Sequence, residues 1–271
     1  MMKLLKSVIA TFIGLVIIGS IGQPVRAESL TIGASPSLHA AFDEIGPLFE
    51  REYAADVHVV YMPSKTLLHN IERGASIDVF VSAGVDKVES LHRKGLTRNT
   101  PRIFTQTSLV LVMPTDSTAT SLSLGEALAD HGTRIAIGDP ETSYLGEITA
   151  RELMKRYPSY KTRSHIVYAR HSDEILDLLR TGKADVGLVY RANLINAGSV
   201  RISDESPISK HAPIQFGQAV VSNCRPSSCA VAEQFSDFLM TPRIQSLLQK
   251  YGFDLPALPR PNYVTRQERA G

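Results

Sequence analysis

Along most of this chain, short apolar runs typical of buried strands alternate with segments typical of amphipathic helices. The first unit, LTIGASPSLHAAFDEIGPLF at residues 30–49, predicts a short strand, a turn of small residues and then a helix. Its helical part carries apolar side chains every three or four residues, the spacing of a buried helix face. These side chains are Leu38, Ala41, Phe42, Ile45 and Phe49. Because alternating β and α elements form mostly parallel sheets flanked by helices, we predict an α/β fold.

Two further predicted strands mark the places where the chain would pass from one lobe to another. Residues 108–113 (SLVLVM) follow three strand–helix units, so we expect a crossover into a second lobe there. Residues 214–222 (IQFGQAVVS) are the candidate for the return. The predicted organisation is lobe I over residues 28–107 and 218–255, lobe II over residues 108–217, and an extended tail over residues 256–271. In such sheets a ligand binds at the carboxyl ends of the strands, where the topology switches.

The N-terminal 27 residues have the pattern of a secretory signal peptide. Lys3 and Lys6 precede an apolar run over residues 7–22, and Val25-Arg26-Ala27 supplies the small residues of a cleavage site. The run is shorter than the roughly 20 residues of a membrane span; an uncleaved anchor is the alternative. Since no cysteine stands at the cleavage site, lipid attachment is not predicted. We expect a periplasmic protein, exported through a signal peptide that is cleaved after Ala27.

The charge composition argues against nucleic acid as a partner. The chain carries 29 Lys and Arg against 27 Asp and Glu, a formal net charge of +2. Loss of the signal peptide removes Lys3, Lys6 and Arg26, which leaves 26 basic against 27 acidic side chains, a net charge of −1. A chain without a basic excess has no general attraction for nucleic acid or for an anionic membrane. Any binding of an anion must therefore depend on local donors.

Cys224 and Cys229 are the only two cysteines and stand in the loop CRPSSC. In an exported protein this spacing indicates a local disulfide. Metal binding would need further ligands, and no His lies close by in the sequence. A loop this short gains only modest stability from closure.

Four predicted helices begin directly after a strand with Ser, Thr or Gly. Their starts lie near Ser37, Ser64, residues 143–146 and Ser172, two in each lobe. The free N–H groups and the dipole of a helix N-terminus favour anions. A cleft between the lobes would therefore gather four such ends around one small anion without Lys or Arg, and Tyr190, at a strand end, would be a further donor. The alternative is that these serines are ordinary N-caps and that Tyr190 is an ordinary strand-end residue.

Several short motifs together resemble the periplasmic molybdate-binding proteins of ABC transporters, which have the type II periplasmic-binding-protein fold. The resemblance extends from Leu30 to Phe253. The matching motifs are Ala34-Ser35-Pro36-Ser37-Leu38, Ser64 within PSKTL, IDVFVSA at residues 77–83, IGDPE at residues 137–141, VGLVY at residues 186–190, FLMTP at residues 238–242 and KYGF at residues 250–253. Their combination, rather than any one of them, carries the resemblance.

The resemblance implies a two-lobed fold, each lobe a mostly parallel sheet flanked by helices. By similarity, the oxyanion is held by hydroxyl and backbone N–H groups of Ser37 and Ser64, by backbone N–H groups of Leu145 and Ser172, and by the hydroxyl of Tyr190. It implies a solute-binding protein that captures molybdate, and tungstate as well, and delivers it to a membrane permease. It implies no catalytic residue, no cofactor and no direct metal ligand, because the metal is held through its oxygens. We expect a monomer.

The chain departs from the family pattern at two places near the predicted site. The turn after GDPE reads Thr142-Ser143-Tyr144-Leu145-Gly146 and lacks the proline usual in the family. The bulkier Tyr144 and Leu145 would alter the pocket wall. Arg170 and His171 stand where the family usually has neutral or acidic residues. Either could approach the anion, or both could lie in solvated surface.

Three other functions remain open. Another tetrahedral oxyanion, such as sulfate, is the nearest alternative, with size as the discriminator; phosphate is disfavoured because its proton at neutral pH has no partner in a site made only of donors. A secreted serine hydrolase would use Ser37 and His39, but the chain lacks the G-x-S-x-G elbow. Those two side chains also do not share a helix face. The third alternative is a docking or sensory module with the same fold.

Overall fold

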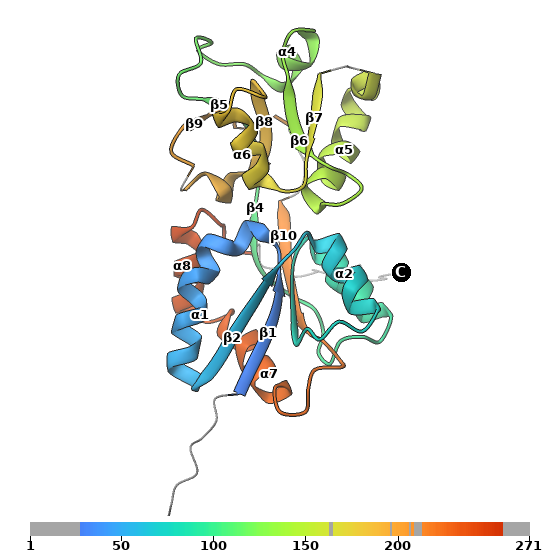
Figure 1. Ribbon diagram of the computed structural model, residues 1–271, viewed down its shortest axis with the longest axis vertical. Coiled ribbons are helices and arrows are strands. Elements are labelled where there is room, and N and C mark those ends of the chain that lie inside the picture. Colours follow the sequence, from blue (N-terminus) through green and yellow to red (C-terminus); the bar gives the residue numbers. More distant parts are fainter. Residues whose placement is uncertain (1–27, 163–164, 196, 206, 209–212, 257–271) are drawn as a thin grey trace, which may run out of the picture.

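The computed structural model describes residues 28–162, 165–195, 197–205, 207–208 and 213–256. The predicted signal peptide and the tail beyond residue 256 lie outside these ranges. The chain forms two lobes, each built on a five-stranded sheet (Figure 1). Within the described ranges, no helix is long and apolar enough to cross a membrane.

The sheet of lobe I has the strand order β2-β1-β3-β10-β4. β1 pairs in parallel with β2 and β3, whereas β10 is antiparallel to β3 and β4. The strands are β1 (Glu28–Ala34), β2 (Ala55–Tyr61), β3 (Val79–Ala83), β4 (Arg102–Thr107) and β10 (Ile214–Val220). The helices are α1 (His39–Tyr53), α2 (Ser64–Glu72), α3 (Val85–Arg93), α7 (Cys229–Phe238) and α8 (Pro242–Lys250), and a short 3-10 turn (Pro36–Leu38) precedes α1.

The sheet of lobe II has the strand order β7-β6-β8-β5-β9. β6 pairs in parallel with β7 and β8, whereas β5 is antiparallel to β8 and β9. The strands are β5 (Leu109–Pro114), β6 (Ile135–Gly138), β7 (Ile166–Ala169), β8 (Val186–Tyr190) and β9 (Val200–Asp204). The helices are α4 (Leu124–Ala129), α5 (Tyr144–Arg156) and α6 (Ser172–Arg180), with 3-10 turns at Pro158–Thr162 and Arg191–Leu194.

In each lobe, the strand by which the chain enters from the other lobe runs antiparallel to its neighbours. β5 enters lobe II directly after β4, and β10 brings the chain back to lobe I. The sequence predicted the returning strand within residues 214–222 and put the lobe boundary at residue 218, whereas β10 is paired within the lobe I sheet from Ile214 onwards. The lobe to which this strand belongs is decided by its pairing with β3 and β4. The residue pattern along a single strand does not reveal this pairing.

The apolar face predicted for the first helix is confirmed. Its five residues are at most 2% exposed: Leu38, Ala41, Phe42, Ile45 and Phe49. Phe49 packs edge-on against Phe235 of α7, with ring centroids 5.1 Å apart. This packing holds α1 against the lobe I core and so determines where its first turn lies.

The predicted disulfide between Cys224 and Cys229 is present in the structure. Its loop is attached to Asp78, which directly precedes β3. The buried carboxylate of Asp78 accepts hydrogen bonds from Ser228 Oγ at 2.6 Å and from Arg225 Nη2 at 2.8 Å. The loop therefore lies at the amino end of β3, the end opposite to Ala83.

Candidate functional site

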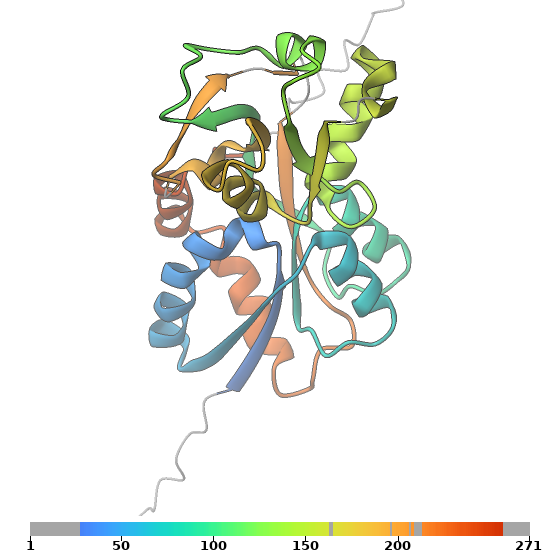
Figure 2. The ribbon, with the colours of Figure 1, turned by 45° about the horizontal axis from the view of Figure 1, so that its top comes forward.

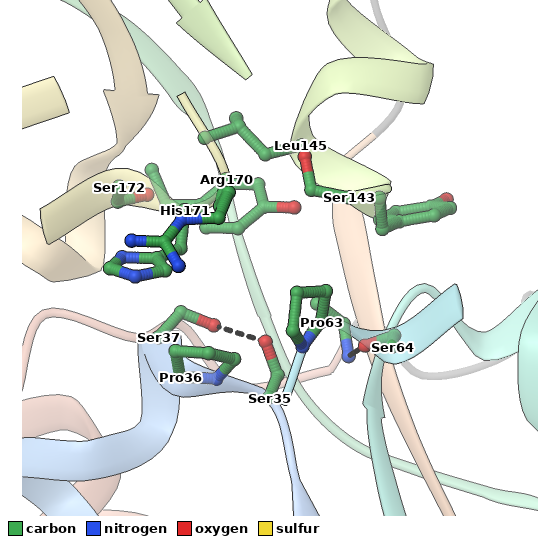
Figure 3. A pocket seen from close by; sticks show the side chains of 13 residues that line it. Ser35, Pro36, Ser37, Pro63, Ser64, Ser143, Leu145, Arg170, His171 and Ser172 are labelled. Carbon is green, nitrogen blue, oxygen red and sulfur yellow. Dashed lines mark hydrogen bonds between the residues drawn. The ribbon is translucent and has the colours of Figure 1, made fainter. Parts of the chain in front are cut away.

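The carboxyl ends of strands from both sheets converge on a small cavity between the lobes. The cavity has a volume of about 20 Å³, enough for one water molecule or a compact ion. Figure 3 shows the lobe I residues on one side of it and the lobe II residues on the other. The 13 lining residues are Ser35, Pro36, Ser37, Pro63, Ser64, Ala83, Ser143, Tyr144, Leu145, Arg170, His171, Ser172 and Tyr190. All five predicted site residues are among them.

Ser37 lies in the 3-10 turn before α1, and its hydroxyl is paired with that of Ser35. The two Oγ atoms are 2.9 Å apart (Figure 3). The interpretation of Ser37 as the N-cap of α1 is wrong, because Leu38 occupies that position. Two hydroxyls carry two protons and only one is used between them, so this pair has one proton left to donate. Ser35 was not predicted; its place two residues before Ser37 in the same turn was the only signal.

Ser64 is the first residue of α2, and Pro63 occupies the N-cap position assigned to Ser64 from the sequence. Ser64 is 2% exposed. Its Oγ accepts a hydrogen bond from the backbone N–H of Ala83 at 3.0 Å. This bond fixes the hydroxyl against the end of β3 and leaves its proton for another acceptor.

Leu145 lies in the first turn of α5 and lines the cavity. Ser143 is the N-cap: its Oγ accepts from Gly146 N at 3.0 Å and donates to the carbonyl of Asp139 at 3.2 Å. The hydroxyl of Ser143 is thus fully used within the turn. The N–H of Leu145 has no acceptor within the helix, because the first four N–H groups of any helix lack one.

A close approach of glycine backbones positions this turn. A Cβ at Gly146 would lie 2.3 Å from the carbonyl of Asp139, and one at Gly138 would lie 2.5 Å from Gly146 N. Only glycine at both positions lets α5 begin this close to the end of β6. The missing proline therefore does not prevent the helix from starting there.

Ser172 begins α6 with a buried hydroxyl. The residue is 4% exposed, and its Oγ has no hydrogen-bond partner in the described part of the chain. His171 is the N-cap, with Nδ1 3.4 Å from the N–H of Glu174. Arg170 donates through Nε to Glu174 at 3.2 Å and its side chain is 72% exposed. Arg170 and His171 thus line the cavity, and both are also tied to the first turn of α6.

Tyr190 ends β8 with its ring against Phe216 of β10, at a centroid distance of 5.9 Å. It is 3% exposed, and within the described ranges its hydroxyl has no partner. Burial raises the pKa of Tyr190 well above 10, and the nearby Tyr144, Glu147 and Asp86 raise it further. The hydroxyl therefore stays protonated and can donate.

The cavity wall offers hydrogen-bond donors and excludes carboxylates. None of the 13 described lining residues is Asp or Glu. Nor do the described residues hold a cluster of three or more His, Cys, Asp or Glu suited to a metal cation. Unpartnered hydroxyls and helix N-termini that meet in one cavity favour an anion whose oxygens accept several hydrogen bonds.

The comparison with known families agrees with this geometry. The sequence model of the bacterial extracellular solute-binding proteins matches residues 30–254. The chain belongs to this family. The family resemblance expected from the motifs is confirmed at this level.

Relatives of this solute-binding protein match it over most of their length. The Bacillus subtilis protein YvgL, named as an ABC transporter substrate-binding lipoprotein, is 30% identical over 84% of this chain and 87% of its own. The molybdate-binding protein ModA of Escherichia coli is 28% identical over 83% of this chain and 89% of its own. A substrate-binding domain assigned to a molybdenum ABC transporter of Clostridium difficile superimposes with a TM-score of 0.65. It is 25% identical and covers 85% of this chain and 100% of its own.

Proposed function

We propose that this solute-binding protein captures molybdate between its two lobes and delivers it to a membrane permease of an ABC transporter. Tungstate, of the same shape and charge, would bind in the same way. The proposal is carried by one observation: buried hydroxyls of Ser64, Ser172 and Tyr190 face a cavity whose described wall contains no carboxylate. The molybdate-binding relatives support the same ligand.

In this proposal, protein groups contact only the oxygens of the anion. Ser37 and Ser64 donate from lobe I; Leu145, Ser172 and Tyr190 donate from lobe II. Each hydrogen bond to a charged oxygen contributes about 1.5–3 kcal/mol. Because donors come from both lobes, the anion holds the lobes together when it binds. The permease would then meet a protein whose shape depends on its load.

Export to the periplasm through a cleaved signal peptide belongs to this proposal, as does the monomeric state. So does the absence of covalent chemistry. The hydrolase alternative gains no support: the hydroxyl of Ser37 is paired with Ser35, and the ring of His39 lies 4.5 Å from that of Tyr61.

Titration calorimetry of the mature protein with molybdate, tungstate, sulfate and phosphate at neutral pH tests the proposal. Molybdate and tungstate should bind tightly, sulfate more weakly and phosphate not at all. If the protein binds sulfate in preference to molybdate, the assignment of the fold and the site stands, but the proposed ligand is wrong. Failure to bind any of the four anions would overturn the proposal.

A further inference from the structure

Lys87 joins the two lobes beside the cavity. It lies in α3 of lobe I, and its Nζ is 2.8 and 3.0 Å from the carboxylate oxygens of Glu147 in α5 of lobe II. The same Nζ is 3.2 Å from Asp86 of its own helix. Only 12% of the Lys87 side chain is exposed. Both views of the ribbon place α5 on the same side of the molecule as α2, the neighbour of α3 (Figures 1 and 2).

The contact between α3 and α5 extends directly to the cavity wall. Tyr144, which lines the cavity, has its ring centroid 5.4 Å from Lys87 Nζ. Gly84 precedes α3 with φ of +95°, and a Cβ there would lie 2.5 Å from two ring carbons of Tyr144. The ring of Tyr144 in lobe II thus packs on the backbone of Gly84 in lobe I, next to the ion pair that Lys87 forms with lobe II.

The carboxylates held by Lys87 are close enough to influence the anion site. Glu147 and Asp86 both raise the pKa of the buried Tyr190 hydroxyl. Asp86 Oδ1 is itself buried without a hydrogen-bond partner among the described residues. Burial lowers the pKa of Lys87, but its bond to Glu147 and the charges of both carboxylates raise it more, so the ammonium stays charged. Lys87 is therefore a cation that offsets two negative charges next to a cavity for an anion.

We propose that Lys87 and Glu147 form a latch between the lobes that couples lobe closure to capture of the anion. The inference rests on the proposed function in so far as the ligand is an anion. When the lobes separate, Glu147 loses its partner in lobe I, so the ion pair favours the closed arrangement. When the lobes close, Lys87 neutralises the charge of Glu147, so that this carboxylate does not repel the anion. Lys87 and Glu147 are thus positioning residues; they do not contact the ligand.

Two single variants distinguish a latch from a simple charge effect. Lys87→Met removes the cation, and both explanations expect weaker binding of molybdate. Glu147→Gln removes a negative charge near an anion, which by charge alone should strengthen binding. The latch expects the opposite, a loss of about tenfold, because a part-buried ion pair across the lobes is gone. The double variant should be no weaker than the weaker single one, since both remove the same interaction.

Lys94→Met is the matched control. Lys94 directly follows α3 and pairs with Glu72 at 2.7 Å, but both residues belong to lobe I. This variant makes the same change of charge without crossing the lobes, and its affinity for molybdate should stay within about twofold of the parent.

Small-angle X-ray scattering of each variant, without added anion and with saturating molybdate, provides a readout independent of affinity. Without anion, the Lys87→Met and Glu147→Gln variants should show a larger radius of gyration than the parent or the Lys94→Met control. With saturating molybdate, which holds the lobes together, all four proteins should show the same radius of gyration. If Glu147→Gln binds molybdate as tightly as the parent or more tightly, or if its radius of gyration without anion equals that of the parent, the latch is wrong. If the parent binds no molybdate, the proposed function fails, while the scattering of the anion-free variants still tests the latch.

Discussion

The backbone N–H of Ala83 donates a hydrogen bond to Ser64 Oγ across 3.0 Å. This bond occupies the serine as an acceptor, so its hydroxyl proton must be donated elsewhere. Among the described residues, this is the one hydrogen bond recorded for Ser64 Oγ, and Ser64 lines the cavity. A hydroxyl held in this way is oriented towards the ligand before the ligand arrives, which reduces the entropy lost on binding.

The Ser64→Ala variant should bind molybdate about 10- to 100-fold more weakly, because a charged oxygen loses a donor worth roughly 1.5–3 kcal/mol. It should also be less stable, since the buried N–H of Ala83 loses its acceptor. Ser82→Ala is the control: Ser82 is fully buried and donates only to the carbonyls of Ala83 and Gly84. Calorimetric titration and thermal melts should show lost stability in both variants and lost affinity in Ser64→Ala alone. Equal affinity of Ser64→Ala and the parent would remove Ser64 from the site.

The paired hydroxyls of Ser35 and Ser37 should differ in their effects. If Ser37 donates to the anion and Ser35 donates to Ser37, Ser37→Ala should cost about 10- to 100-fold in affinity. Ser35→Ala should cost only about threefold, because the donor to the anion remains while its hydrogen-bonded neighbour is lost. Titration of both variants with molybdate gives the order. The reverse order would mean that Ser35 is the residue that holds the anion.

Tyr190→Phe should weaken the binding of molybdate without lowering the stability of the protein. The buried hydroxyl of Tyr190 lacks a protein partner within the described ranges, so its removal should stabilise the protein without anion or leave it unchanged. Binding of molybdate should weaken about tenfold. Tyr160 is the control, because its hydroxyl is also buried without a described partner but belongs to lobe II away from the cavity. Tyr160→Phe should keep full affinity; a similar loss in both variants would indicate a general effect on lobe II.

The sequence predicted those parts of the site that depend on local order. The spacing of Leu38, Ala41 and Phe42 identified the buried face of α1, and a serine after a strand marked the helix starts at Ser64 and Ser172. Such features depend on neighbours a few residues away, which the printed sequence displays directly.

The remaining features depend on pairs that are distant in the sequence. Ser64 meets Ala83 at a separation of 19 residues, and Lys87 meets Glu147 at a separation of 60. No periodicity links such positions, because the fold alone brings them together. The packing of Tyr144 on Gly84 is of the same kind: the sequence indicated a bulky residue near the pocket wall and could not say which backbone it would meet.

Loss of the disulfide between Cys224 and Cys229 should affect stability alone. Closure of so short a loop should contribute about 2 kcal/mol to the free energy of unfolding. The loop is attached to Asp78 at the amino end of β3, away from the cavity. The double variant Cys224→Ala/Cys229→Ala should therefore unfold at lower urea concentration and bind molybdate with unchanged affinity. A loss of affinity beyond about twofold would connect this loop to the site.

The carboxylate of Asp78 should make stability depend on pH in the acid range. The side chain is 1% exposed and accepts hydrogen bonds from Thr31 N, Ser228 Oγ and Arg225. Burial raises the pKa of Asp78, but these hydrogen bonds lower it more, so the folded pKa lies below the ordinary value of 3.8. A lowered folded pKa means that the contribution is fully present above pH 4 and is lost as the pH falls through the folded pKa.

Asp78→Asn should therefore lower the free energy of unfolding at pH 7 by about 2–3 kcal/mol, since an ionised acceptor of several hydrogen bonds becomes neutral. The difference from the parent should shrink as the pH falls below 4. Urea unfolding of both proteins between pH 7 and pH 3 measures it. Asp237→Asn is the control, because Asp237 is 77% exposed and pairs with Arg102 at the surface; it should follow the parent over the whole range. A constant gap between Asp78→Asn and the parent down to pH 3 would mean that Asp78 stabilises the loop by packing rather than through its charge.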